Sequence, residues 1–149
     1  MTGPRGDAAN AARVPAPPDL VGVWTLAAFH DVEADGERSE GPLGPEPRGL
    51  LIYTADGHVS VHMMRVTGTA SAPGARDYMG YGGTWRIEDG RIVHTIRVTP
   101  TRPWIDTEQI RVAEPDGRDR LTLHGSARVG DAERRRVLEW RRQTGGPGS

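Results

Sequence analysis

The chain has 149 residues, which is enough for one domain with a hydrophobic core. Its 19 basic residues, all of them arginine, are balanced by 20 acidic ones, and the net charge of −1 offers no broad positive field for nucleic acid. There is no cysteine, which excludes disulfides and thiolate chemistry, and no apolar run of membrane-spanning length. We therefore expect neither a nucleic-acid nor a membrane partner.

The two ends of the chain carry no structural pattern. Residues 1–18 are rich in glycine, alanine and proline, and they lack both a hydrophobic period and the apolar core of a signal peptide. We expect a disordered N-terminal tail over 1–18, a single domain over 19–143, a short C-terminal tail over 144–149, and a cytoplasmic location.

The first strand of the domain is expected to begin near Asp19-Leu20 and to run to about Val32. Side chains alternate between the two faces of a strand, so one face should carry Gly22, Trp24, Leu26 and Ala28. The next segment, Glu33–Pro47, is rich in glycine, proline and acidic residues, and it predicts a long loop.

The stretch Arg48–Arg65 predicts two strands joined by a tight turn at Ala55-Asp56-Gly57, because Gly57 can adopt the positive φ that closes a hairpin loop. The register that follows pairs Tyr53 with Val59, Leu51 with Val61, and Gly49 with Met63. The face that carries these pairs is the more apolar one and is expected to point inward, which leaves His58 and His62 outside.

A second hairpin is expected after a loop over Thr67–Asp77, with strands at Tyr78–Glu88 and Arg91–Val98. Asp89-Gly90 is a strong two-residue turn signal, and it places Trp85 opposite His94. The apolar face of the second strand would carry Ile92, His94, Ile96 and Val98.

Three further strands complete the pattern, at about Trp104–Glu114, Arg120–His124 and Glu133–Arg142. Their apolar faces would carry Ile110, Val112, Leu121, Leu123, Leu138 and Trp140. About eight consecutive strands joined by short turns favour an all-β fold with a single antiparallel up-and-down barrel, because closure removes the exposed edges of a sheet. A β-sandwich is the alternative.

Several of these segments resemble the bacterial lipocalin-like domain family, a group of calycin-type β-barrels. They are LVGVWTL at Leu20–Leu26, PRGLLIYTADGHVSVHMM at Pro47–Met64, GTWRI at Gly83–Ile87, DTEQIRV at Asp106–Val112 and VLEWR at Val137–Arg141. In lipocalins the tryptophan of a Gly-x-Trp motif closes the barrel floor, and an arginine of the last strand stacks on it. The resemblance gives these roles to Trp24 and to either Arg141 or Arg142. It implies a small-molecule cavity and fixes no reaction.

The candidate catalytic residues are His94, Tyr53 and Glu108. Imidazole titrates near neutral pH, so an inward His94 could act as an acid or a base; the alternative is a core histidine with a hydrogen-bond partner. Tyr53 could donate a hydrogen bond to a ligand carbonyl, or it could serve only in packing. Glu108 could lie at a cavity rim, where its pKa would rise, although a solvated strand end is more usual for glutamate.

The residues expected to bind a ligand are mostly large and apolar: Trp24, Met63, Tyr81, Trp85, Ile96, Trp104, Ile110, Leu123 and Trp140. The alternative is an ordinary filled core. The chain has four tryptophans and one phenylalanine, and indoles leave irregular gaps, which favours a cavity. His58 and His62 share a strand face, but the sequence offers no third ligand, so we expect no metal site and no cofactor.

Two classes of function stay open. The first is a cofactor-free cyclase or isomerase that holds an apolar, polyketide- or terpenoid-like intermediate of bacterial specialised metabolism in a reactive conformation. The second is a non-catalytic carrier or sensor of a small hydrophobic ligand, and either could be a homodimer. Titratable groups that face the cavity would favour the first class, and a filled barrel would favour a structural role.

Overall fold

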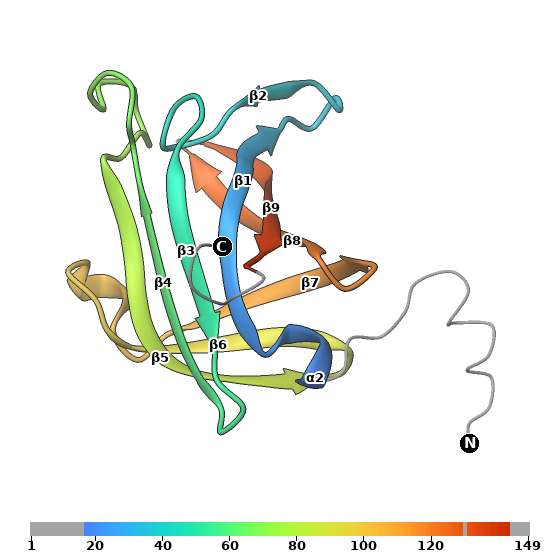
Figure 1. Cartoon of the computed structure of the whole chain (residues 1–149). Helices are drawn as coiled ribbons and strands as arrows, with labels where there is room; N and C mark the ends of the chain where they lie inside the picture. Colours follow the sequence, from blue (N-terminus) through green and yellow to red (C-terminus); the bar gives the residue numbers. More distant parts are fainter. Residues whose placement is uncertain (1–16, 130, 144–149) are drawn as a thin grey trace.

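The computed structural model describes residues 17–129 and 131–143, which form a closed antiparallel β-barrel (Figure 1). A one-turn helix, α2 (Pro17–Leu20), comes first. The strands are β1 (Gly22–Val32), β2 (Arg38–Glu40), β3 (Arg48–Tyr53), β4 (His58–Met64), β5 (Tyr78–Glu88), β6 (Arg91–Val98), β7 (Glu108–Asp116), β8 (Arg120–Val129) and β9 (Ala132–Arg142). Residues 1–16 of the tail expected over 1–18, and the tail expected over 144–149, lie outside the described residues, whereas residues 17 and 18 belong to α2.

Pairing of the first long strand with the last one closes the barrel. The strands follow one another in the order β2-β1-β3-β4-β5-β6-β7-β8-β9, and β1 also pairs with β9. The predicted up-and-down barrel is thereby confirmed, and the sandwich is excluded. Strand β2 pairs with His30–Val32 at the end of β1, so the segment Glu33–Pro47 is not the plain loop that its composition predicts.

Both predicted hairpins have the expected register. Tyr53 pairs with Val59 in the first hairpin, and Trp85 pairs with His94 in the second. The second turn, Asp89-Gly90, has positive φ values of 54° and 76°, as a two-residue type I′ turn requires. Local turn chemistry therefore sets which side chains of four strands point into the barrel.

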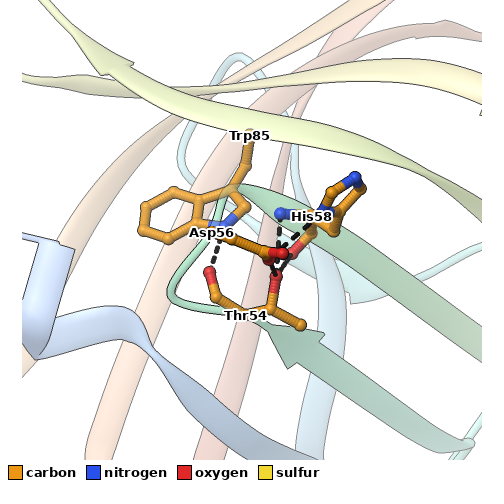
Figure 2. A network of polar contacts seen from close by, with 4 residues as sticks. All are labelled: Thr54, Asp56, His58 and Trp85. Atoms are coloured by element: carbon orange, nitrogen blue, oxygen red, sulfur yellow. Dashed lines mark hydrogen bonds and ion pairs between the residues drawn. The ribbon is translucent and has the colours of Figure 1, made fainter.

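The tip of the first hairpin is held by polar contacts (Figure 2). Thr54 Oγ1 accepts a hydrogen bond from the backbone N–H of His58 at 2.9 Å and donates one to Asp56. Trp85 Nε1 donates to the carbonyl oxygen of Thr54 at 3.0 Å. Trp85 of β5 is therefore hydrogen-bonded to the turn between β3 and β4.

A β-bulge in β1 changes which of its residues face inward. The register with β9 shifts between Leu26 and Ala28, and the buried residues change from Trp24 and Leu26 to Phe29 and Asp31. The predicted face is correct up to Leu26 and wrong at Ala28, because simple alternation does not continue through a bulge. The bulge brings the carboxylate of Asp31 into the barrel.

The faces predicted for β7 are reversed. Ile110 and Val112 are 48% and 47% exposed, whereas Ala113 is buried. Gln109 and Arg111, which share the parity of Ala113, line the barrel interior. The interior of the barrel is polar at this strand, so its apolar face is not the inner one.

The start of β7 and the facing of Val98 also differ from the prediction. Strand β7 begins at Glu108 and not near Trp104, because Arg102–Trp104 forms a 3-10 turn, η1. Val98 is 73% exposed, because the pairing of β6 with β5 shifts by one residue between Gly82 and Gly83.

The floor of the barrel joins its first and last strands. The guanidinium of Arg142 lies 4.3 Å from the ring centroid of Trp24, and it donates hydrogen bonds to the carbonyl oxygens of Val21 and Asp19 at 2.7 and 2.8 Å. A Cβ at Gly22 would lie 2.7 Å from Arg142 Nη1, which explains the glycine. Of the two arginines that the sequence leaves open, the structure assigns the floor contact to Arg142.

The described residues contain no helix that is both long enough and apolar enough to cross a membrane.

Candidate functional site

The barrel interior contains a cavity of about 330 Å³. Its apolar wall is formed by residues of several strands: Phe29, Leu51, Val61, Met63, Met79, Leu123, Leu138 and Trp140. Polar side chains complete the lining: Tyr81, His94, Gln109, Ser126, Arg76, Arg111, Arg128 and Arg136. Gly74 and Arg76 belong to the segment between β4 and β5, which lies at the opposite end of the barrel from α2 (Figure 1). The barrel is therefore not a filled core.

A buried histidine between two tyrosines is the polar centre of this cavity. The hydroxyl of Tyr53 lies 2.7 Å from Nε2 of His94, and the hydroxyl of Tyr81 lies 2.6 Å from Nδ1. The three side chains come from β3, β5 and β6, and all three are buried. Both ring nitrogens of His94 are therefore engaged.

The numbers of donors and acceptors require these two hydrogen bonds to run in opposite directions. A neutral imidazole has one N–H, so one tyrosine donates to His94 and the other accepts from it. Within 17–129 and 131–143 each hydroxyl has only His94 as a partner, but Tyr81 lines the cavity, where a ligand can accept its hydrogen, and Tyr53 does not. We therefore assign the hydrogen bond to Nε2 to the hydroxyl of Tyr53, which is 1% exposed. The Nδ1–H of His94 then donates to Tyr81, which lines the cavity. The O–H of Tyr81 is left to donate to a ligand.

Burial keeps this triad uncharged near neutral pH. Burial, reinforced by the nearby positive charge of Arg111, lowers the pKa of His94 to about 3. Burial also raises the pKa of Tyr81 to about 12 and that of Tyr53 well above its usual value, although Arg111 opposes both shifts. The triad therefore offers hydrogen bonds to a ligand and no charge.

Arg111 supplies a charge beside the triad. Its inward side chain crosses from β7 to Gly125 on β8, where a Cβ would lie 2.6 Å from Nη1. Glycine at 125 therefore leaves room for the guanidinium. Arg111 donates from Nη1 to the carbonyl oxygen of Ile110 at 3.1 Å.

An ion pair lies farther along the same interior. Asp31 Oδ1 is 3.2 Å from Nε of Arg136, and Asp31 Oδ2 is 3.8 Å from Nη1 of Arg134. Burial raises the pKa of Asp31, and the two arginines oppose this shift. Arg134 also pairs with Glu33 at 3.4 Å. The acid introduced by the β1 bulge thus offsets the charge of Arg136.

The three candidate catalytic residues lie in different places. His94 faces the cavity, and Tyr53 lies behind it as its hydrogen-bond partner. Glu108 lies on the outside of the barrel, where it pairs with Arg86 at 3.1 Å. It takes no part in the cavity, and its position matches the solvated strand end that the sequence also allows.

The expected ligand-binding residues divide into two groups. Those that line the cavity are Met63, Tyr81, Trp104, Leu123 and Trp140. Those that do not are Trp24 in the floor, Trp85 at the hairpin tip, the buried Ile96 and the exposed Ile110. The cavity therefore occupies one part of the barrel, and the remaining indoles are structural.

Sequence reasoning missed the arginines of the cavity. Arg111 was hidden because Ile110 and Val112 make the opposite face of β7 look like the inner one. The one signal in the sequence was Ala113, which lies on the same face of β7 as Arg111. A small residue suits a crowded interior, so Ala113 could have indicated that this face points inward. Arg76 lies in a predicted loop, and its guanidinium stacks 5.0 Å from the ring centroid of Trp104.

The histidine pair on β4 lies outside the barrel. His58 pairs with Asp56 at 3.1 Å, and His62 contacts Ser60 and the hydroxyl of Tyr78. Over residues 17–129 and 131–143, no cluster of three histidine, cysteine, aspartate or glutamate side chains could hold a metal ion.

The solved structures that are similar to this chain share little of its sequence. A redesigned β-barrel is 12% identical, with a TM-score of 0.48, and the match covers 89% of this chain and 98% of the other. A de novo designed fluorescence-activating β-barrel is 15% identical, with a TM-score of 0.45, over 86% and 97% of the two chains. Lobster apocrustacyanin A1 is 10% identical, with a TM-score of 0.45, over 97% and 71%.

Family membership follows from the sequence itself. No curated protein matches this chain. The family model of the lipocalin-like domain matches residues 21–143, which span every barrel strand and the Trp24–Arg142 floor. The chain therefore belongs to the lipocalin-like domain family.

Proposed function

We propose that this protein is a cofactor-free cyclase or isomerase that acts on an apolar, carbonyl-bearing intermediate of polyketide or terpenoid type in bacterial specialised metabolism. The observation that carries the proposal is the Tyr81 hydroxyl, which the His94–Tyr53 pair holds at the wall of a cavity with both apolar and polar lining. With the directions assigned above, the oxygen of Tyr81 accepts from His94 and its hydrogen has no acceptor, which is costly for a buried donor and supports a ligand with a matching oxygen.

The chemistry needs only shape and one hydrogen-bond donor. Tyr81 donates to a carbonyl oxygen and stabilises the negative charge that develops on that oxygen. In a ring closure, a nucleophilic carbon of the same molecule bonds to the carbonyl carbon, the π electron pair moves to oxygen, and the proton that the nucleophile loses ends on that oxygen. Product and substrate are isomers, so no co-reactant is consumed. The cavity wall supplies the folded conformation that brings the two carbons together.

A carrier of the same type of molecule is the second candidate. It is favoured by the neutral state of His94, whose pKa of about 3 leaves no group of the triad to exchange a proton near neutral pH. In a carrier, Tyr81 would anchor the ligand oxygen without turnover.

The experiment compares Tyr81→Phe with Tyr78→Phe. Tyr78 is an exposed tyrosine of the same strand, on the outer face beside His62, and it serves as a matched control. Each protein is incubated with ten-carbon unsaturated aldehydes and ketones, citronellal among them, and the isomeric products are followed by gas chromatography. We expect turnover that Tyr81→Phe lowers by about a hundredfold and Tyr78→Phe leaves unchanged.

Two results would count against the enzyme. Binding of these carbonyl compounds without turnover, with affinity weakened by Tyr81→Phe, would establish the carrier instead. Turnover that survives Tyr81→Phe would show that the donor is another group.

A further inference from the structure

The charge of the cavity lining is one-sided. Four arginines, Arg76, Arg111, Arg128 and Arg136, line the cavity, and no aspartate or glutamate of the described residues does so. The whole chain has a net charge of −1, so this imbalance is a property of the cavity and not of the composition. Positive walls of low dielectric concentrate a negative ligand group.

Three of these four arginines have no carboxylate partner among the described residues. Arg136 pairs with Asp31, whereas Arg128 donates to the carbonyl oxygen of Asp131 at 3.2 Å and Arg76 stacks on Trp104 at the loop. In residues 17–129 and 131–143, Arg111 forms no ion pair, and its guanidinium donates to the carbonyl oxygen of Ile110. Arg111 therefore places a positive charge without a carboxylate partner next to the triad.

One buried polar atom of a residue that lines the same cavity has no hydrogen-bond partner among the described residues. The indole Nε1 of Trp140 is buried, and the described part of the chain gives it no hydrogen-bond acceptor. Trp140 lines the cavity with Arg111, so a ligand oxygen held there could accept from it. A buried donor without an acceptor is costly, and an anionic oxygen is the strongest acceptor that could satisfy it.

We infer that the ligand of this cavity is a carboxylate with an apolar body, and that Arg111 binds its carboxylate group. A guanidinium matches a carboxylate in shape and charge, and Arg111 forms no ion pair with a carboxylate of the described residues. The apolar body would lie against Leu51, Met63 and Leu138. This inference rests on the proposed function, because it names the substrate class of the same cavity.

The test uses decanoate, methyl decanoate and decan-1-ol as probes of the full chain. The three share one apolar tail and differ in charge, and binding is followed by isothermal titration calorimetry and by tryptophan fluorescence. We expect decanoate to bind the wild-type protein about tenfold to a hundredfold more tightly than decan-1-ol. Arg111→Gln should remove that preference by weakening the binding of decanoate.

Two further variants show whether position or charge is responsible. Gly125→Ala keeps the charge but places a Cβ 2.6 Å from the present position of Arg111 Nη1, so the guanidinium must move and decanoate should bind more weakly. Arg120→Gln removes an exposed arginine of the same strand as Gly125 and should change nothing. Circular dichroism checks that each variant is folded.

The outcomes separate this inference from the proposed function. Equal affinity for decanoate and decan-1-ol in the wild-type protein, or a preference that survives both Arg111→Gln and Gly125→Ala, overturns the carboxylate and leaves an apolar cavity with its Tyr81 donor. Binding of none of the three probes overturns the cavity as a ligand site, and with it both proposals.

Discussion

Acidification should lower the free energy of unfolding of the barrel through protonation of one buried residue, His94. In an unfolded chain a histidine has a pKa of about 6.5. In the fold, burial and the charge of Arg111 lower the pKa of His94 to about 3. Between these two values the unfolded chain binds a proton that the folded chain does not bind. The stabilisation is therefore fully present above about pH 6.5 and is lost as the pH falls toward 3, and linkage gives a loss of roughly 2 kcal/mol between pH 7 and pH 5.

The assay is urea denaturation of the wild-type protein and of His94→Gln at pH 7 and at pH 5. Glutamine can still accept from one tyrosine and donate to the other, so the variant keeps a polar centre without a titrating group. Burial also lowers the pKa of His30 and raises that of Asp31, and these groups are common to both proteins. The difference between wild type and variant therefore isolates His94.

We expect the free energy of unfolding of the wild-type protein to fall by about 2 kcal/mol more than that of His94→Gln between the two pH values. Parallel losses in the two proteins would refute the reasoning, because they would mean that His94 takes up a proton in the fold as readily as in the unfolded chain. The neutral Tyr53–His94–Tyr81 arrangement would then have to be abandoned.

Two further predictions concern packing. Arg142→Leu removes the stack on Trp24 and three hydrogen bonds to carbonyl oxygens, and it should lower the free energy of unfolding by about 2–4 kcal/mol in urea, whereas an unchanged midpoint would contradict the structural role of the floor. Gly83→Ala would place a Cβ 1.9 Å from the carbonyl oxygen of Thr95 and should abolish the cooperative thermal transition seen by circular dichroism. Gly82→Ala, whose nearest such contact is 3.7 Å, should fold normally, and equal melting temperatures for the two glycine variants would contradict the close approach of β5 and β6 at Gly83.

The fold was predictable where short-range chemistry decides it. Turn residues such as Asp89-Gly90 select one hairpin geometry, and with it the register of the two strands that they join. Because register fixes which side chains point inward, Tyr53 and His94 could be placed inside the barrel from the sequence. Their contact with each other could not, since they lie on β3 and β6 and their separation depends on the curvature of the whole sheet.

The candidate site was less predictable, because it breaks the rules that sequence reasoning uses. Arg111 is inward on a strand whose apolar residues point out, and the rule that the more apolar face is the inner one fails at such a strand. The bulge after Leu26 places Asp31 inside the barrel. No residue type in β1 indicates that the strand contains a bulge, so this placement could not be predicted. Departures of this kind are expected at functional sites, where a residue is placed for binding or catalysis and not according to the usual burial and alternation patterns of a strand.

The contact between Arg142 and the start of β1 has a consequence for how a nascent chain acquires this shape. The guanidinium binds the carbonyl oxygen of Val21 across 121 positions of sequence. Bringing such distant segments together costs chain entropy of about 4 kcal/mol beyond a constant term, and the contact can form only after the last strand has left the ribosome. Until then β1 and β8 each keep an open edge, able to pair with a strand of another chain. Aggregation is therefore most probable during one interval of synthesis, after β8 has been made and before β9 has left the ribosome and paired with β1.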